Sequence, residues 1–198
     1  MSTVKSKKVQ FGVDASASNN FTIYQPAVPD GTLRVGVGNA DSPTEVGQFN
    51  ANGYKPQQPV IFRANRSAVQ TISTATYTKV QFNNVDFDTN SNYDNTTNYR
   101  FTPTVAGYYL INSLVSITSA TYMVFTNIYK NGSVYQFSNR QQLGTISGHR
   151  AVSNNAIVYM NGSTDYLELY VYQDSGSNKN TIASSAECNF TGMLVAQA

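Results

Sequence analysis

Charged side chains are scarce in this chain, where Asp, Glu, Lys and Arg make up 12% of the 198 residues. The 13 basic and 11 acidic residues nearly balance and leave a net charge of +2. Beyond Lys5, Lys7 and Lys8 there is no basic cluster, whereas a nucleic-acid-binding protein normally presents a basic stripe. We therefore expect no nucleic-acid partner, and we interpret the three lysines as part of a solvated terminus.

Cysteine and histidine each occur once. Cys188 cannot form an internal disulfide, and its apolar neighbours predict a buried thiol. Because His149 is the only histidine, we expect no His-rich metal site, no His-Asp triad and no His-x-x-x-His zinc motif within one subunit. These two absences argue against hydrolases and zinc enzymes.

Long apolar runs are also missing. No stretch of about 18 apolar residues is available to span a membrane. The N-terminal sequence MSTVKSKK lacks the apolar segment of a signal peptide. We therefore expect no membrane span, and we expect synthesis in a cytoplasm.

Carboxylates gather in one segment, at Asp86, Asp88 and Asp94. A glycosidase needs only two suitably separated carboxylates, so this segment is the candidate for a glycan-cleaving site. The favoured interpretation is that Asp88 and Asp94 are turn residues whose side chains bond the nearby backbone. The segment also offers oxygen ligands for calcium, although it lacks the Asp-x-Asp-x-Asp-Gly spacing of a dedicated loop. The asparagines that would join such a site are Asn84, Asn90 and Asn92. We expect no enzymatic activity and no cofactor, with calcium left open.

The residues that are abundant favour strands. Asn, Ser and Thr dominate the polar positions and aromatic residues reach 12%, a composition typical of strands joined by turns. From Val60 onward, apolar and polar residues alternate with period two, and Asn131-Gly132 and Asn161-Gly162 are turn signals. Helical periodicity is absent, so many short strands predict a β-sandwich. The predicted strands are 60–65, 77–82, 99–102, 106–117, 121–130, 133–138, 150–160, 164–173 and 187–196.

The first 59 residues differ from the rest. Strand-like pieces at 21–24 and 32–35 flank Pro29-Asp30-Gly31, which predicts a hairpin, and residues 47–59 have the composition of a linker or an irregular edge. This region has too few large apolar residues to close its own core, so we expect it to pack on the head, on symmetry mates or on another protein. We therefore predict an attachment segment at 1–59 and a main domain at 60–198.

A spaced set of aromatic, acidic and glycine residues marks the middle of the chain: Phe82, Asp88, Tyr93, Phe101, Gly107 and Tyr109. Residues 102–111 contain a Pro-x-x-x-Gly-x-Tyr block, and the sequence Phe190-x-Gly192-x-Leu194 follows near the C-terminus. Over residues 60–196 this order of residue types resembles the globular head domain of complement component one-q, one of the tumour-necrosis-factor-like jelly rolls.

The resemblance implies both a fold and a mode of action. We expect an all-β chain, a ten-stranded antiparallel jelly-roll sandwich with a small β-rich N-terminal attachment segment. Heads of this family are trimeric binding modules rather than enzymes, so a homotrimer is expected. The residues that carry the fold motif are Phe82, Phe101, Gly107, Tyr109, Phe190 and Gly192.

Outward-facing tyrosines give a separate hint of subunit contact. If the apolar residues of 167–171 face the core, Tyr170 and Tyr172 face outward, and Tyr108 does the same beside Tyr109. Tyrosine suits interfaces because it buries area while its hydroxyl stays hydrogen-bonded. We predict that Tyr108, Tyr170 and Tyr172 lie in the trimer interface; carbohydrate stacking and plain surface positions are the alternatives.

The N-terminal segment is similar to another group. Residues 9–14, 19–22 and 29–36 resemble N-terminal pieces of bacteriophage tail fibres and other virion appendages. The resemblance implies a protein of the virion surface, made in the host cytoplasm and attached to other virion proteins through residues 1–59. On this hypothesis the homotrimeric fibre or spike binds a host surface glycan or protein through its head, with the polar loops 139–148 and 173–184 as contact candidates. The alternatives are a capsid decoration or head-fibre protein without a receptor and, second, a glycan-cleaving enzyme.

Overall fold

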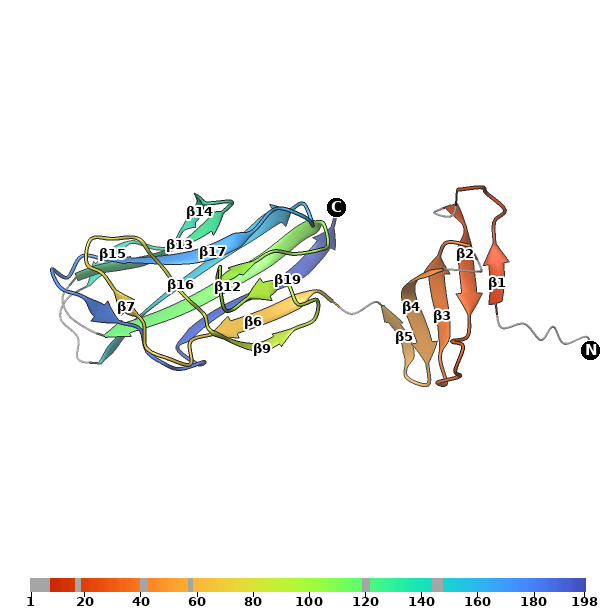
Figure 1. Ribbon diagram of the computed structural model, residues 1–198, viewed down its shortest axis with the longest axis horizontal. Coiled ribbons are helices and arrows are strands. Elements are labelled where there is room, and N and C mark those ends of the chain that lie inside the picture. Colours follow the sequence, from red (N-terminus) through yellow and green to blue (C-terminus); the bar gives the residue numbers. More distant parts are fainter. Residues whose placement is uncertain (1–7, 17–18, 40–42, 57–58, 119–121, 144–147) are drawn as a thin grey trace, which may run out of the picture. The chain divides into compact units, whose positions relative to one another are not determined.

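The computed structural model describes residues 8–16, 19–39, 43–56, 59–118, 122–143 and 148–198. It divides into two compact units, Met1–Gln58 and Pro59–Ala198, and the predicted boundary lies one residue from this division (Figure 1). Strands dominate both units, and within the described ranges no residue is in an α-helix. None of the described residues belongs to a helix that could span a membrane.

The N-terminal unit is one antiparallel sheet in the order β1-β2-β3-β4-β5. Its strands are Lys8–Phe11, Phe21–Tyr24, Leu33–Val37, Thr44–Asn50 and Gly53–Pro56. The hairpin predicted around Pro29-Asp30-Gly31 is confirmed, because β2 and β3 pair on either side of it and Gly31 takes a positive φ of 78°. Residues 47–59 were predicted to be a linker or an irregular edge, and the described part of this stretch, 47–56, belongs to the edge of the sheet. A tight turn at 51–52 lets this stretch fold back as β5, the edge strand of the sheet.

The second unit is a sandwich of two main antiparallel sheets. The first has the order β16-β12-β19-β6-β9, and the second β10-β11-β17-β13-β14, with β15 added to β13 and β8 to β17 (Figure 1). A third, two-stranded sheet joins β18 to β7. The strands of the first sheet are His149–Met160, Gly107–Thr118, Cys188–Gln197, Ile61–Asn65 and Asn84–Asp88. Those of the second are Tyr93–Asp94, Arg100–Phe101, Leu167–Gln173, Tyr122–Lys130 and Ser133–Phe137, with Gln141–Leu143 and Thr78–Lys79; β18 and β7 are Lys179–Asn180 and Thr71–Ile72.

This arrangement confirms the all-β jelly-roll class, with a difference in strand number. The described residues of the sandwich form fourteen strands rather than ten. Five of these strands are only two residues long: β7, β8, β10, β11 and β18. The strand predicted at 77–82 shrinks to β8, although Val80 and Phe82 just beyond it are fully buried. Two residues show no periodicity, so short strands of this kind escape pattern analysis.

Aromatic rings fill the space between the two main sheets. Phe62 of β6 stacks on Phe101 with ring centroids 4.2 Å apart and meets Phe190 edge-on at 5.4 Å. Phe82 stacks on Phe190 at 5.8 Å, and Tyr109 meets Phe101 edge-on at 5.5 Å. All five rings are at most 1% exposed, so the spaced aromatics of the sequence converge on one core.

Gly107 and Gly192 of the motif are required because neighbouring atoms approach their backbone too closely for a Cβ. A Cβ on Gly192 would lie 2.5 Å from the Phe62 ring and 2.8 Å from Ile111, so glycine is what lets these side chains cross β19. A Cβ on Gly107 would lie 2.3 Å from the carbonyl oxygen of Ala196, where the first residue of β12 passes the end of β19. The glycines of the motif therefore serve packing between neighbouring strands.

The Asn131-Gly132 hairpin between β13 and β14 is confirmed. Both turn residues have positive φ, 52° and 78°, as a two-residue hairpin turn of this kind demands. Asn161-Gly162 forms the second predicted turn, between β16 and β17, and Gly162 also has positive φ.

Candidate functional site

One face of the first sheet of the sandwich is apolar and exposed. Directly opposed residues of antiparallel strands share a face, and one row across four strands consists of Ile157, Leu110, Met193 and Ile61. Ile157 is 59% exposed and Met193 43%. We call the side chains on this side of the sheet the apolar sheet face; its further exposed members are Phe87, Tyr108, Tyr159 and Val195.

The apolar sheet face has a polar end and a shallow hollow. The next row across the sheet is Asn155, Asn112, Thr191 and Arg63, so one end of the face is polar. A hollow of about 280 Å³ lies between the two rows, lined by residues of both rows and by Phe87. Tyr108 and Tyr159 pair at the apolar end with ring centroids 5.5 Å apart. Contiguous exposed apolar surface of this kind marks an interaction site.

Aromatic side chains also cover the outside of the second sheet. We call this group the outer aromatic layer, and it consists of Tyr77, Phe125, Tyr129, Phe137, Tyr170 and Tyr172. Tyr172 stacks on Phe125 with ring centroids 5.0 Å apart, and the ring centroids of Tyr129 and Tyr170 are 4.2 Å apart. The Arg140 guanidinium lies 3.9 Å from the Phe137 ring centroid and 4.6 Å from that of Phe125. A cation held over two rings is a favourable and directional contact.

A buried asparagine lies within this layer. Asn127 is opposite Tyr170 on β17 and Phe137 on β14, and it is 0% exposed. Its side-chain nitrogen and oxygen have no hydrogen-bond partner among the described residues. A buried amide without partners is costly. Partial burial among these rings raises the pKa of both Tyr129 and Tyr170.

The predicted interface tyrosines lie on two different sheets. Tyr108 belongs to the apolar sheet face, whereas Tyr170 and Tyr172 belong to the outer aromatic layer. All three point away from the core, but the three do not form one patch. Their role in a trimer interface stays a prediction, and the structure associates only Tyr108 with the large apolar face.

The carboxylate segment is occupied by internal contacts. Asp86 accepts hydrogen bonds from Arg63 Nε at 2.9 Å and Asn65 Nδ2 at 2.7 Å. Asp88 accepts the Tyr93 backbone N–H at 2.6 Å, as the turn interpretation predicted. Asp94 accepts the backbone N–H groups of residues 97, 96 and 98, and these bonds hold the pKa of its carboxyl well below the usual range.

Other titratable groups are similarly paired or scattered. His149 Nδ1 lies 2.9 Å from Glu187 Oε2, and Lys79 pairs with the buried Glu168 at 2.5 Å. In the part of the chain that the structure describes, no three His, Cys, Asp or Glu side chains are grouped to hold a metal ion. Calcium binding at the carboxylate segment stays a prediction.

The two predicted recognition loops contain short strands. Within 139–148, β15 pairs with β13, and residues 144–147 lie outside the described residues. Within 173–184, β18 pairs with β7. Their part in recognition stays a prediction.

Comparisons with known proteins identify the fold. No protein-family model matches the chain, and no curated protein matches it in sequence. Among solved structures, murine APRIL at pH 8.0 is similar with a TM-score of 0.55 and 8% identity, over 70% of this chain and all of that one. Eiger TNF from S. frugiperda has a TM-score of 0.52 and 10% identity, over 72% of this chain and 96% of that one.

The globular domain of zebrafish complement 1qA is similar as well. Its TM-score is 0.50 at 17% identity, and the alignment covers 71% of this chain and all of that domain. These likenesses confirm that residues of the second unit adopt the complement one-q and tumour-necrosis-factor type of jelly roll. At such low identity they concern the fold alone.

Several residues of the two surfaces were not predicted. Ile157 and Met193 were assigned to strands without a role, although alternation along 150–160 already places Ile157 outward. Phe125, Asn127 and Arg140 carry no local signal, because their roles arise from β13, β14 and β17 lying side by side.

Proposed function

We propose that this chain is a non-enzymatic, homotrimeric protein on the surface of a bacteriophage particle. Residues 1–59 attach it to other virion proteins, and the head binds a host surface glycan or protein. The apolar sheet face carries the trimeric part of the proposal, because a monomer would leave this contiguous apolar surface in water. The complement-like fold, whose family is trimeric according to the resemblance, agrees with this assignment.

The trimer is tested by mass measurement on the full chain. Wild type is expected at three times the 21.6 kDa of one chain. Ile157→Asp places a charge in the middle of the apolar row and is expected to give monomers. Val134→Asp is the matched control, since Val134 is 40% exposed but lies on β14 of the other sheet. A monomeric wild type, or a trimeric Ile157→Asp variant, would contradict the proposed interface.

Target recognition is assigned to the outer aromatic layer. Arg140 lies over the rings of Phe125 and Phe137 and so places a guanidinium beside aromatic surface. Aromatic faces with a nearby hydrogen-bond donor are suited to polar ring-shaped ligands such as sugars, the alternative that the outward tyrosines left open. The virion context rests on the resemblance of the N-terminal segment to phage appendages.

Host binding is tested with the purified trimer and host cells. Wild type is expected to bind the cells and to block phage adsorption, and Arg140→Ala is expected to reduce both by about tenfold, roughly the loss of one 1.4 kcal/mol contact. Val69→Ala, at an exposed apolar residue outside the layer, is the control. A trimer that binds no cells would favour the capsid decoration role without a receptor.

A further inference from the structure

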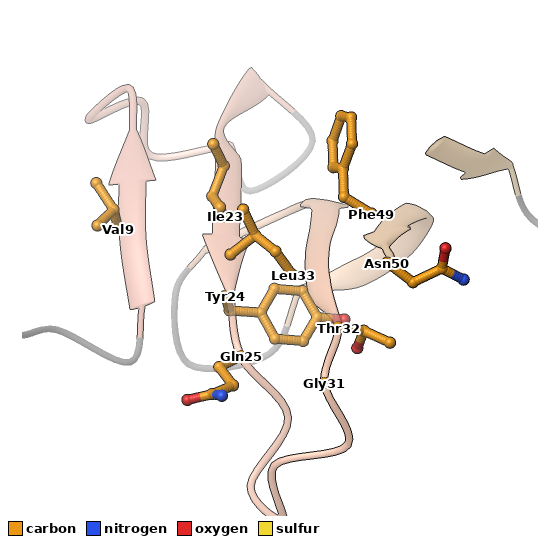
Figure 2. A pocket seen from close by; sticks show the side chains of 9 residues that line it. All are labelled: Val9, Ile23, Tyr24, Gln25, Gly31, Thr32, Leu33, Phe49 and Asn50. Carbon is orange, nitrogen blue, oxygen red and sulfur yellow. The ribbon is translucent and has the colours of Figure 1, made fainter. Parts of the chain in front are cut away.

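The N-terminal sheet has one largely apolar face. In the register of its strands, Val9 lies opposite Ile23 and Ile23 opposite Val35. Opposed residues share a face, so these side chains lie on the same side of the sheet. We call this side the N-terminal apolar face; its further apolar members are Phe11, Phe21, Val37, Leu33 and Phe49, and Thr44 lies on it opposite Val37. Figure 2 shows Val9, Ile23, Leu33 and Phe49 on four successive strands.

The N-terminal apolar face is open among the described residues. Phe11 is 53% exposed, Phe21 52% and Leu33 47%, values far above those of a packed core. A hollow of about 550 Å³ lies over β1 to β4 and is lined by Val9, Ile23, Leu33 and Phe49 together with polar neighbours (Figure 2). A sheet normally buries its apolar face against a second layer, and the described part of this unit supplies none.

The opposite face of the same sheet is polar and internally satisfied. Arg34 forms ion pairs with Asp30 and Glu45, both at 2.7 Å. Thr22 is fully buried and donates to the carbonyl oxygen of Gly38 at 3.0 Å. Loops and ion pairs therefore complete the polar face within one chain, whereas no described residue of this unit forms a layer over the apolar face.

The size of the apolar face indicates what kind of partner can cover it. Five strands spaced about 4.8 Å apart and four residues of about 3.3 Å give a face of roughly 300 Å². Stable association of separate proteins buries about 800 Å² of accessible surface on each partner. The face is thus too small to capture an independent protein from solution, and a partner must already be held nearby.

Other copies of the same chain meet this condition in the proposed trimer. Only four residues separate the end of β5 at Pro56 from the start of β6 at Ile61. Short linkers give effective concentrations in the millimolar range, so three N-terminal sheets tethered to one trimer meet far more often than free partners. The face carries no charged side chain, and a second copy of the face matches it in that respect.

We propose that the N-terminal apolar faces of the three chains pack against one another in the trimer. This inference rests on the homotrimer of the proposed function. The packed faces supply the second layer that each sheet lacks, and they leave the polar faces with Arg34, Asp30 and Glu45 directed outward. The attachment segment is then a three-chain platform whose polar outside meets the particle.

The test uses single cysteines in the full chain. Phe49→Cys and Leu33→Cys lie on the N-terminal apolar face, and Gln48→Cys, next to Phe49 on the same strand but on the opposite face, is the control. Native Cys188 is fully buried and contributes little to labelling of the folded protein. Each variant is treated at low micromolar concentration with a short bismaleimide and, separately, with a fluorescent maleimide. The mass of the native assembly is measured in parallel.

The expected result has two parts. The two apolar-face variants form covalent dimers within the trimer and are labelled at least about tenfold more slowly than Gln48→Cys, which forms none. A trimer in which both cysteines are labelled as fast as the control overturns the inference while the trimer stands. Slow labelling without cross-links at either position also overturns it, because the cover would then belong to the same chain. A monomeric mass overturns the trimer and the inference together.

Discussion

At the scale of single residues, Tyr109 links the core to the sequence motif. Its ring packs edge-on against Phe101, and its hydroxyl donates to the carbonyl oxygen of Val105 at 2.8 Å. Burial raises the pKa of this hydroxyl to about 12. A tyrosine in an unfolded chain loses its proton near pH 10, so the folded protein keeps a proton that the unfolded chain releases.

Alkaline unfolding tests this role of Tyr109. Between about pH 10 and pH 12 the unfolded state binds fewer protons, so the free energy of unfolding falls as pH rises across that window. Tyr109→Phe is expected to cost about 1 kcal/mol at pH 7, from the lost hydrogen bond, and to show a shallower decline at high pH. Urea unfolding at several pH values measures both effects. Equal slopes for wild type and variant would contradict the assignment.

At the scale of elements, two turns at one end of the sandwich hold each other. Asn131 of the β13–β14 hairpin donates to Asp165 Oδ1 at 2.7 Å and accepts the Tyr166 backbone N–H at 2.9 Å. Lys130 pairs with Asp165 at 2.9 Å. The hairpin is therefore fixed both by its own turn geometry and by the segment that enters β17.

Asn131→Asp tests the connection between the turns. The substitution replaces the donor to Asp165 with a second carboxylate, and a loss of about 1 to 3 kcal/mol is expected at pH 7. This loss of stability should shrink below pH 4, where protonation of a carboxylate removes the repulsion between residue 131 and Asp165. Asn131→Gly is the control, since it permits the positive φ and removes the side-chain bonds without adding charge. Thermal unfolding is the measurement, and a variant as stable as wild type at pH 7 would refute the coupling.

At the scale of the whole molecule, the two units differ in how far each completes its own core. The sandwich buries its aromatic cluster between two sheets, whereas the N-terminal unit is a single sheet with an open apolar face. Single sheets need a second layer for independent stability. We therefore expect the second unit to fold by itself and the first to depend on a partner surface.

Separate expression of the two units tests this difference. The fragment 59–198 is expected to fold, to form trimers and to unfold within a few degrees of the main transition of the full chain. The fragment 1–58 alone is expected to show the circular dichroism of an unstructured chain, because roughly 300 Å² of apolar face per copy does not offset its chain entropy. Cooperative unfolding of monomeric 1–58 would show that this unit needs no partner.

Local pattern alone determined much of the sandwich. The alternation along 106–117 and 164–173 and the two Asn-Gly turns depend on neighbours in sequence, and these strands and turns are found where they were predicted. The same pattern could not decide whether 47–59 is a linker or an edge, since β4 and β5 are held by cross-strand pairing rather than by a strong apolar alternation.

Only the tertiary structure decided which exposed residues belong together. Alternation tells whether a side chain faces in or out on its own strand, but the order of strands comes from pairings far apart in sequence. For this reason Tyr108, Tyr170 and Tyr172 were predicted as one group and lie on two sheets. The sequence by itself determined an all-β chain with a complement-like head. Its two exposed apolar faces, one on each unit, became visible only when the strands were placed side by side.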